Sequence, residues 1–414
     1  MEDFFSVADL DGVFAHIPEF SRVGMETVPL TEALGRVLAE DLHADADLPP
    51  FSRSTMDGYA VRASTTFGAS EGNPAYLNVA GAIAMGESPD FSLGPGECAR
   101  IATGGMLPRG ADAVVMIEHT ERLDERDIGG TIEVYRSVAP GQHVIQRGED
   151  VQNGAVLLTG GRRLRPQEIG LLAAFGIGSV PVHRRPVIGI LSTGDEVIPI
   201  GERPGPGQIR DINTYTLSGL IREAGGEPKR FGIVADDYES LRAGVDAALA
   251  ASDMVLVSGG SSVGTRDFTI DVFTNLPDSA ILVHGISISP GKPTILARIG
   301  GRAVWGLPGH VVSAMVVFSQ VVRPFIDHVS GTASAERRPV RRIPARLSRN
   351  IASAQGRIDF IRVRLTEREG ELWAEPILGK SGLIHTMVKA DGLVAVGMNT
   401  EGLDRDAVVS VIPV

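Results

Sequence analysis

Apolar runs alternate with amphipathic segments through the middle of the chain, from residue 186 to about 332. The runs VIGILS, RFGIVA, DMVLVS and AVWGL are short and mostly apolar, as strands buried on both faces are. Segments with helical spacing of apolar residues follow, including YESLRAGVDAALAA and VVSAMVVFSQVV. Alternating strands and helices are typical of a parallel sheet with helices on both faces. We therefore predict an α/β domain over residues 186–332.

The N-terminal part of the chain has a helical spacing of apolar residues instead. Those positions are Val7, Leu10, Val13, Phe14 and Ile17. Thr31 is placed to cap a second short helix, TEALGRVLAE. Farther along, a helix is predicted from near Pro166 to an end at Gly176. Residues 1–45 and 145–185 are therefore predicted to form one helical and mixed N-terminal domain.

Two other stretches have the alternation and the turn residues of β structure. Residues 46–144 contain AYLNVAGAI, AVVMIEHTER and TIEVYRSV between Gly/Pro turns. After a basic, turn-rich linker, SGTASAERRPVRR, residues 336–414 contain RIDFIRVRL, ELWAEPI and GLVAVG. We predict a β-rich domain inserted at 46–144 and a C-terminal β domain at 336–414. The predicted fold class is multidomain α/β plus β.

Composition supports several packed domains and narrows the choice of ligands. A chain of 414 residues exceeds one ordinary core, and its 43% hydrophobic residues are normal for a globular protein. The net charge of −12 argues against general binding to nucleic acid, because that binding depends on many Lys and Arg contacts to phosphates. A small anionic substrate stays compatible if backbone amides, a lysine or a bound cation reverse the local field.

The cellular context follows from features that the sequence lacks. Cys98 is the single cysteine, so an internal disulfide and a multi-cysteine metal site are excluded. The N-terminus, MEDFFSVADLDG, lacks the positive charge and the apolar stretch of a secretory signal. The longest apolar segment, Val311 to Phe318, is too short to span a membrane. We expect a cytoplasmic protein with no membrane partner and no nucleic-acid partner.

Polar or glycine-rich loops follow three of the predicted strands. They are Ser192, Thr193, Gly194, Asp195 and Glu196; then Gly259, Gly260, Ser261, Ser262, Val263 and Gly264, with Asp267 beyond; and Pro308, Gly309 and His310. In open α/β sheets, ligands bind beyond the carboxyl ends of the strands. Glycine loops and a helix start offer backbone N–H groups to a phosphate or oxyanion. One glycine loop is weak support, since turns need glycine, but three such loops together predict a binding site.

The acidic residues of these loops suit a metal ion. Two like charges about 4 Å apart repel by roughly 4 kcal/mol at an effective dielectric of 20. Gathering Asp195, Glu196 and Asp267 near phosphates is therefore explained if Mg²⁺ lies between them. The alternative is that Asp195 and Glu196 only solvate a loop, and the residues alone leave it open.

Three further positions have both a functional and a structural interpretation. Lys292 lies in a stiff turn, SPGKP, that would aim its cation at an anion, although an idle surface lysine is also compatible. Asp57 and Asp150 lie in the turns MDGY and RGED, where acidic residues are common turn formers. The sequence has no Walker loop, G-x-S-x-G elbow or H-E-x-x-H pair, which argues against a P-loop NTPase, a serine hydrolase and a zincin.

These loops together resemble the molybdopterin molybdenumtransferase family, which includes the C-terminal domain of gephyrin. The matching segments are PPFSRSTMDGYAVR, RIATGGMLPRGADAVVMIE, RGEDV, ILSTGDEV, VSGGSSVGTRDF, PGKP, WGLPGHVVSAMVVF and GRIDFIRVRL. They occur in the family's order over most of residues 49–362, with weaker similarity through SGLIHTMVKADGL. The resemblance implies a central molybdopterin-binding parallel-sheet domain and a small C-terminal β-barrel domain. It also implies an elongated homodimer of four-domain subunits, whose active cleft includes residues of the partner subunit.

The resemblance further implies a reaction, in which adenylylated molybdopterin and molybdate give molybdenum cofactor and AMP with Mg²⁺ required. Asp195, Glu196 and Asp267 would bind the metal or the pterin nucleotide. The molybdate oxyanion would be surrounded by Lys292, Pro293, Ser313, Arg357 and Ser381. A tetrahedral dianion favours a lysine, an arginine and hydroxyl donors of this kind.

The remaining residues implied by the resemblance are catalytic or bind the pterin nucleotide. The catalytic candidates are Asp57, Thr103, Asp150, Asp267 and Lys292, the first three donated across the dimer. The candidates for binding the pterin nucleotide are Ser192, Thr193, Gly194, Gly259, Gly260, Ser261, Gly264, Pro308 and Gly309. We hypothesise that Mg²⁺ and the glycine-loop amides neutralise the pyrophosphate while molybdate attacks it or assists its cleavage. Asp267 is the candidate for a general base.

Two positions depart from the family's common pattern. Ser289 precedes Pro290 where many relatives carry a cation, so one anion contact is expected to be weaker or supplied elsewhere. His310 and Val311 stand where Asn-Pro is frequent after LPG, so the helix start is expected to differ, although His310 can still form a hydrogen bond. Neither departure removes an expected carboxylate.

Three other functions compete with this one. The adenylylating partner enzyme uses a domain similar to residues 186–330, but usually that domain alone. A dimeric scaffold of the gephyrin type would have no reason to hold charges such as Glu196 and Lys292 in a cleft. A paralogue that loads tungstate is not separated by the sequence, because the two oxyanions have nearly the same size and charge. Transient contacts with other molybdenum-cofactor enzymes are also expected.

Overall fold

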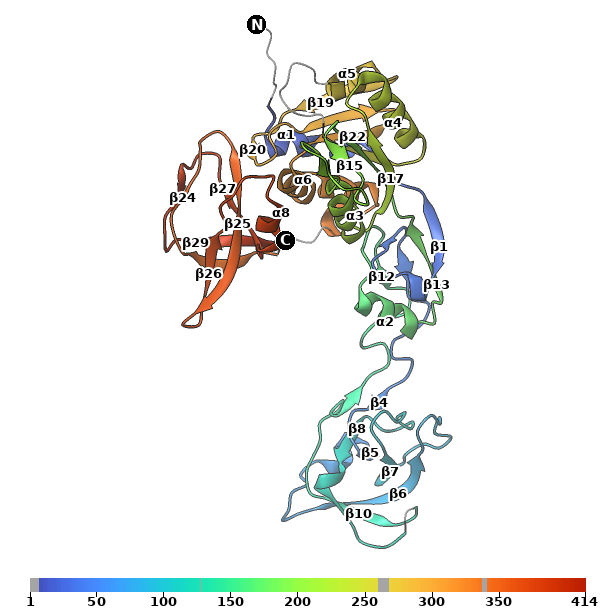
Figure 1. The fold of residues 1–414 in the computed structure, drawn as a ribbon. Coiled ribbons are helices and arrows are strands. Elements are labelled where there is room, and N and C mark those ends of the chain that lie inside the picture. The colour runs from blue at the N-terminus through green and yellow to red at the C-terminus, as the bar shows by residue number, and fades with distance from the viewer. Residues whose placement is uncertain (1–6, 127, 260–267, 337–340) are drawn as a thin grey trace. The chain divides into compact units, whose positions relative to one another are not determined.

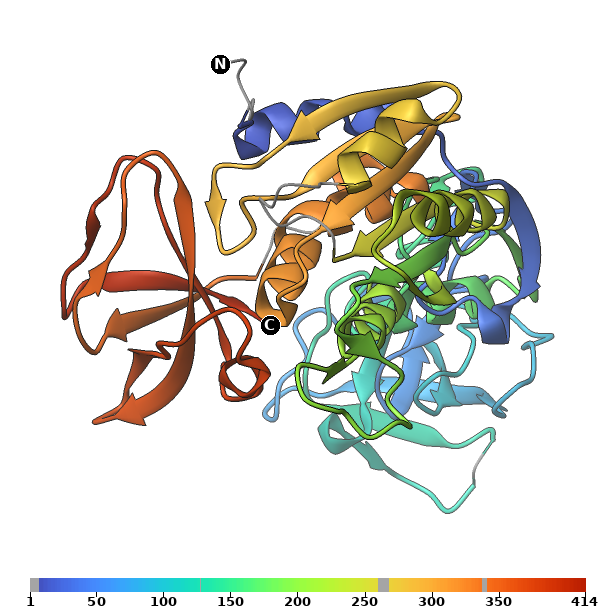
Figure 2. The ribbon, with the colours of Figure 1, turned by 45° about the horizontal axis from the view of Figure 1, so that its top comes forward.

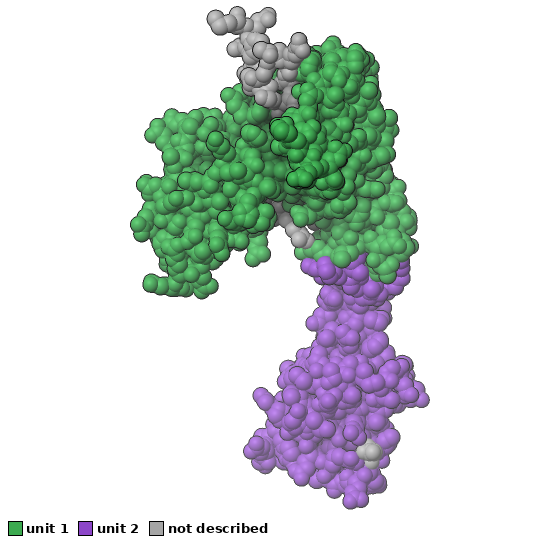
Figure 3. Space-filling view, viewed as in Figure 1, with its two compact units in different colours: residues 1–40, 160–165, 179–414 green, residues 41–159, 166–178 purple. Residues whose placement is uncertain are grey.

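The computed structural model describes residues 7–126, 128–259, 268–336 and 341–414. The chain divides into two compact units, which Figure 3 shows in different colours. Unit 1 comprises residues 1–40, 160–165 and 179–414, and unit 2 comprises residues 41–159 and 166–178.

The centre of unit 1 is a mixed, mostly parallel sheet. In spatial order, its described strands are β17 (Glu227–Val234), β14 (Val187–Thr193), β18 (Met254–Ser258), β22 (Arg302–Leu307), β21 (Ile295–Ile299) and β19 (Ser279–His284). The strands β17, β14, β18 and β22 run parallel, which confirms the predicted α/β fold class. The antiparallel strands β21 and β19 were not predicted. The Gly300-Gly301 turn between β21 and β22 has positive φ at both residues (53° and 76°), as a two-residue hairpin requires.

Helices cover both faces of this sheet (Figures 1 and 2). One face carries α3 (Asn213–Glu223), α6 (Val311–Val317) and α7 (Arg323–Val329), and the other carries α4 (Tyr238–Ala250) and α5 (Phe268–Asn275). A π-helical segment, Phe318–Val322, joins α6 to α7. Successive strand residues point to opposite faces, so Leu256 packs in one apolar core and Val257 in the other. The mostly apolar strands of the sequence thus supply both cores.

The N-terminal segment of unit 1 contains less helix than predicted. The helix α1 (Leu10–Ala15) and the short 3₁₀ turn Ile17–Glu19 pack Val13 and Ile17 against the α/β core. The predicted helix TEALGRVLAE was wrong, because Gly35 adopts a left-handed φ of 74° that interrupts it. In its place are a 3₁₀ turn and strand β2 (Val37–Leu38), which joins β1 (Met25–Pro29) and β13 (Ser179–His183) in a small sheet.

The C-terminal part of unit 1 is a closed β-barrel, as the predicted fold class states. Its strands, in order around the barrel, are β25 (Ile358–Arg368), β26 (Glu371–Pro376), β23 (Ile343–Leu347), β29 (Val408–Pro413) and β27 (Gly392–Val396), and β27 pairs back to β25. The short strand β20 (Ile288–Ser289) comes from the α/β part of the chain and pairs in parallel with β25. A short helix, α8 (Ile384–Val388), lies between β26 and β27 in sequence.

Unit 2 is β-rich, as predicted. Its main described sheet has the order β8 (Ala113–Met116), β5 (Gly58–Val61), β7 (Glu97–Ile101), β6 (Ala75–Ile83), β10 (Thr131–Val134) and β9 (Thr120–Arg122). Two short antiparallel pairs follow, β4 (Arg53–Ser54) with β11 (Val144–Ile145) and β3 (Leu42–His43) with β12 (Val156–Leu158). The predicted helix is confirmed as α2 (Pro166–Ala174), and Gly176 beyond it has φ 69°.

Cys98 lies in the core of the unit 2 sheet and is fully buried. Burial and the charge of neighbouring Glu97 raise the pKa of its thiol to about 12. The thiol therefore stays protonated and unreactive near neutral pH. In the part of the chain that the structure describes, no helix is both long enough and apolar enough to cross a membrane.

Candidate functional site

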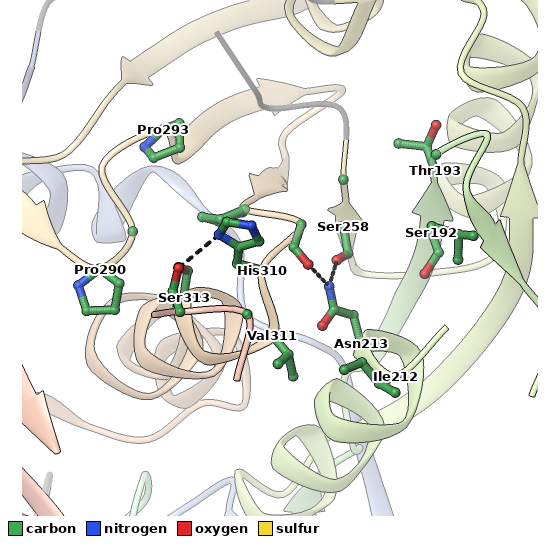
Figure 4. Close-up of a pocket in the computed structure, with 18 of the residues that line it drawn as sticks. Ser192, Thr193, Ile212, Asn213, Ser258, Pro290, Pro293, His310, Val311 and Ser313 are labelled. Atoms are coloured by element: carbon green, nitrogen blue, oxygen red, sulfur yellow. Dashed lines mark hydrogen bonds between the residues drawn. The ribbon is translucent and has the colours of Figure 1, made fainter. Parts of the chain in front are cut away.

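A large pocket opens at the carboxyl ends of β14, β18 and β22, and its volume is about 1150 Å³. These three strands are neighbours in the sheet, so the strand ends from which the three selected loops start lie side by side. Figure 4 shows Ser192, Ser258 and His310, one from each strand end, around the same space. The predicted pocket-lining residues that the structure brings together are Ser192, Thr193, Gly194, Glu196, Gly259, Lys292, Pro293, Pro308, Gly309, Ser313, Arg357 and Ser381.

The loop after β14 directs its two carboxylates differently. The Asp195 carboxylate accepts a hydrogen bond from the backbone N–H of Asp236 at 3.2 Å, and Asp195 does not line the pocket. Glu196 does line it, together with Asp236 from the loop after β17. The Thr193 hydroxyl donates to the Asp236 carboxylate at 3.4 Å. These two loops thus supply one predicted carboxylate and one, Asp236, that was not among the predicted site residues. Asp211, before α3, also lines the pocket, and its carboxylate accepts a hydrogen bond from the Thr214 N–H at 3.1 Å.

The Asp236 carboxylate has an unfavourable electrostatic environment. Burial raises its pKa, and the charges of Asp195, Glu196 and Asp237 raise it further, although the Thr193 hydroxyl lowers it. Like charges that are held together in this way are stabilised when a cation binds between them. Among the residues that the structure describes, no three His, Cys, Asp or Glu side chains are close enough to hold a metal ion. The predicted third carboxylate, Asp267, lies outside the described residues, as do Gly260, Ser261 and Gly264.

Asn213 ties the start of α3 to two of the strand ends. Its Nδ2 donates to the Ser258 hydroxyl at 2.7 Å and to the Gly309 carbonyl at 2.8 Å (Figure 4). A carbonyl can only accept, so the amide nitrogen must face Gly309, and the amide orientation is fixed. The buried Oδ1 of Asn213 is left with no hydrogen-bond partner. Asn213 was not among the predicted site residues, and nothing in its sequence spacing showed that it bonds to two separate strand ends.

Gly259, the first residue after β18, packs closely against the backbone at the end of β14. Its φ of 109° lies in the region that favours glycine, and a Cβ atom there would lie 2.1 Å from the Thr193 carbonyl oxygen. Any larger residue would push the two strand ends apart. The close approach of the backbones therefore shapes this wall of the pocket.

The opposite side of the pocket carries the predicted oxyanion residues. Pairing of β20 with β25 places the loop that holds Lys292 and Pro293 beside the strand that follows Arg357. The Arg357 guanidinium forms an ion pair with the Asp359 carboxylate at 3.0 Å. Burial alone would raise the pKa of Asp359, but the Ser353 and Ser289 hydroxyls and the Arg357 charge outweigh it and lower the pKa. Asp359 therefore stays ionised and fixes the position of Arg357.

His310 joins the loop after β22 to the barrel loop at Ser381. Its Nδ1 lies 2.8 Å from the Ser381 hydroxyl oxygen, and the backbone N–H of Val312 donates to the Ser381 carbonyl at 3.0 Å. Both His310 and Ser381 line the pocket. The sequence marked His310 as a departure from the family pattern, and the structure places it among the pocket residues.

The other predicted catalytic residues lie in unit 2. The Asp57 carboxylate accepts hydrogen bonds from the backbone N–H of Thr103 at 2.7 Å and from its hydroxyl at 3.0 Å. These two bonds lower the pKa of Asp57, and the side chain is exposed. Asp150 is not part of this pair: its N–H donates to the Leu48 carbonyl at 3.1 Å, on the far side of the β4–β11 ribbon from Asp57.

Comparison with known proteins covers nearly the whole chain. Residues 8–176 match the family model of the MoeA N-terminal region (domain I and II), and residues 344–414 match that of the MoeA C-terminal region (domain IV). Between them, residues 189–328 match a "probable molybdopterin binding domain". A molybdopterin molybdenumtransferase from Bacillus subtilis is 33% identical over 410 residues, which cover 97% of this chain and 93% of that protein. The chain belongs to the MoeA family.

Relatives and solved structures of the MoeA family agree with this assignment. A molybdopterin molybdenumtransferase from Haemophilus influenzae is 35% identical and covers 81% of this chain and 80% of its own. The crystal structure of a MoeA molybdopterin biosynthesis protein from Pyrococcus horikoshii is 31% identical, with a TM-score of 0.84, and covers 99% of this chain and 100% of that chain. The resemblance drawn from the sequence motifs is therefore confirmed. Asn213 and Asp236 also line the pocket, and both lie outside the sequence segments that carried this resemblance.

Proposed function

We propose that this chain inserts molybdate into adenylylated molybdopterin, releasing AMP and forming molybdenum cofactor in a Mg²⁺-dependent reaction. One observation carries the proposal: a single pocket has cationic and hydroxyl groups on one side and the Glu196 and Asp236 carboxylates on the other. The first set suits a tetrahedral oxyanion and the second suits a divalent cation beside a pyrophosphate. The curated relatives are named for this transfer.

The oxyanion side would bind molybdate through Lys292, Arg357 and the hydroxyls of Ser313 and Ser381. Charge-assisted hydrogen bonds from Lys and Arg are stronger than neutral ones, and Arg presents its donors in a fixed fork. The Asp359 carboxylate limits the movement of Arg357 through their 3.0 Å ion pair. Molybdate would thus be held in one orientation next to the bound pterin.

The acidic side would hold Mg²⁺ through Glu196 and Asp236, with Asp195 and Asp267 as the further ligands expected from the sequence. The pKa of Asp236 is raised first by burial and then by the charges of Asp195, Glu196 and Asp237, and a cation bound beside these carboxylates would relieve that repulsion. When bound, the ion would neutralise the charge of the pyrophosphate that links AMP to the pterin. The chain's own contribution is positioning: the Asn213 bonds and the Gly259 contact hold the loops that line the nucleotide.

The proposal includes a homodimer in which unit 2 of one copy serves the pocket of the other. Asp57, already aligned by Thr103, and Asp150 would be donated in this way. A mixture of inactive D57A and K292A proteins, refolded or co-expressed together, would then contain heterodimers with one intact pocket. Recovered activity in the mixture supports sharing across the dimer, and a mixture as inactive as its components rejects it.

The test of the activity is AMP release from adenylylated molybdopterin with Mg²⁺, with and without molybdate. We expect release that depends on molybdate, and a product that reconstitutes an apo molybdoenzyme. Turnover with tungstate but not with molybdate would reassign the chain to tungsten loading. Binding without turnover on either oxyanion would reject the transferase and leave a scaffold.

A further inference from the structure

The hydrogen bond between His310 and Ser381 has two directions, and they differ in what Ser381 offers to the pocket. The Nδ1 to Oγ distance is 2.8 Å, which is short enough for a good bond in either direction. The backbone bond from Val312 to the Ser381 carbonyl holds the two segments together independently of the imidazole. A change in the side-chain bond can therefore occur without separating the barrel loop from the α/β part of the pocket.

A serine hydroxyl has one proton to donate, and whether Nδ1 of His310 carries a proton, as it always does in the charged imidazole, decides where that serine proton points. When Nδ1 carries no proton it accepts, so the Ser381 O–H points at His310 and only its lone pairs face the pocket. When the imidazole is protonated, Nδ1–H donates to Ser381 Oγ, and the hydroxyl proton is free to point into the pocket. Oxygen lone pairs repel an oxyanion, whereas an O–H donor binds it.

The groups around His310 favour coupling between this proton and an anion. Its own loop contributes only the uncharged Pro308 and Gly309 to the pocket, and Ser381 and Gly382 face it from the barrel loop. The charged and titratable side chains on the neighbouring elements are Lys292 on the β20 loop, Arg357 and Asp359 at β25, Lys380 before α8 and His385 within it, Asp211 before α3, and Glu196 and Asp236 at the strand ends. The Asp359 carboxylate on this side is already paired with Arg357, so an entering dianion would add a further negative charge near His310.

We propose that His310 is a positioning residue that sets the donor direction of Ser381 through its own protonation, so that oxyanion binding takes up a proton. The proposal rests on the proposed function, in which Ser381 contacts molybdate. It also goes beyond that function, because it predicts oxyanion binding that is coupled to proton uptake and therefore weakens as pH rises. His310 acts through Ser381 and does not itself need to touch the oxyanion.

The experiment is calorimetric titration of the intact protein with molybdate, repeated with tungstate and sulfate, at several pH values. Each titration is run in two buffers of different ionisation enthalpy, so that proton uptake on binding is measured directly. For the wild type we expect net proton uptake on binding, and an affinity that falls as pH rises by up to about tenfold per pH unit for one proton taken up. The control is His385→Asn, which removes an exposed imidazole outside the pocket and should keep the wild-type pH profile.

Two variants separate positioning from simple charge. His310→Asn places a permanent amide donor near the position of Nδ1, and it should bind oxyanion with little dependence on pH and without proton uptake. Ser381→Ala retains the imidazole charge but removes the hydroxyl, so most of the pH dependence should disappear with it. Equal proton uptake in the wild type and His310→Asn would overturn the proposal, and so would a full pH dependence in Ser381→Ala, which would show that His310 acts by charge alone.

Direct binding also distinguishes this inference from the proposed function. If the wild type binds oxyanion with proton uptake but releases no AMP, the transferase reaction fails and the role of His310 stands. If AMP is released in a molybdate-dependent reaction while binding takes up no proton, the transferase stands and the role of His310 fails. Absence of any oxyanion binding overturns both.

Discussion

The strand-end pocket of unit 1 and the Asp57 turn of unit 2 hold their carboxylates in opposite ways. Asp57 is exposed and receives two hydrogen bonds from Thr103, so its pKa is lowered and its charge is already compensated. Asp236 is partly buried beside three other carboxylates, so its pKa is raised and its charge is not compensated. The first arrangement is complete as folded, whereas the second favours a cation. The hydrogen-bond donors and charges around a carboxylate therefore indicate whether a bound cation would stabilise it.

The largest expected effect tests whether unit 1 supplies the whole oxyanion side. Replacing Lys292 and Arg357 together by alanine removes two charge-assisted hydrogen bonds. We expect kcat/KM for molybdate, measured by AMP release, to fall about 10²- to 10⁴-fold. Arg405→Ala, which removes an exposed arginine of the same barrel, should leave it unchanged. Full cofactor formation by the double variant would remove the oxyanion site from this side of the pocket.

A smaller effect tests the uncompensated charge of Asp236. Its pKa is raised in the folded protein, so stability is lost as pH rises from the ordinary Asp value through the raised value. Asp236→Asn removes this loss. Without Mg²⁺, the variant should therefore melt at a higher temperature than the wild type at neutral pH, with no difference in acid where Asp236 is protonated.

Saturating Mg²⁺ should reduce or reverse this gain, because the wild type then binds the ion that its carboxylates favour. The neighbouring Asp237 provides the contrast, since it caps α4 by accepting a hydrogen bond from the Ser240 N–H at 2.9 Å. Asp237→Ala should lower the melting temperature with or without Mg²⁺. If Asp236→Asn were destabilising at neutral pH without the ion, the electrostatic account of this cluster would be wrong.

The smallest expected effect concerns the Asp57 turn. Thr103→Val removes the hydroxyl donor and keeps the backbone donor, so the pKa of Asp57 should rise part of the way towards its ordinary value of 3.8. Thr103→Ser should preserve the lowered pKa. NMR titration of the carboxyl group measures both. Because the folded pKa is depressed, the stabilisation is present above the ordinary pKa and lost as pH falls through the folded value. An unchanged pKa in Thr103→Val would assign the whole effect to the backbone bond.

Local patterns in the sequence predicted the α/β architecture and the adjacency of the strand-end loops. The runs that became β14, β18 and β22 are mostly apolar, and parallel strands bring their carboxyl ends to one edge of the sheet. The helix predicted over TEALGRVLAE failed at Gly35, where the left-handed turn outweighed the apolar spacing. The barrel closure between β25 and β27 depends on pairing of distant segments, which short-range patterns do not determine.

The site was predictable where a residue acts through its own loop and less so where it acts across loops. Lys292 and Glu196 line the pocket and stood out in short motifs. Asn213 matters because it bonds to Ser258 and Gly309, which are 45 and 96 residues away in sequence. Asp195 was predicted for the site, but Asp236 lines the pocket in its place. The Asp195 carboxylate instead accepts a hydrogen bond from the Asp236 N–H. Such exchanges depend on side-chain geometry, and the catalytic roles themselves stay predictions.

The pairing of β20 with β25 couples the evolution of two segments that are distant in sequence. In sequence, β20 belongs to the α/β part, but in space it is a strand of the barrel sheet, with Ile288 beside Ile358 and Ser289 beside Asp359. A chimaera that takes its C-terminal residues from a relative would bring a new partner for β20 while keeping the old loop around Lys292. Recombination at the linker is therefore not neutral for the pocket. Substitutions in β20 and its loop are therefore expected to be selected together with substitutions in β25.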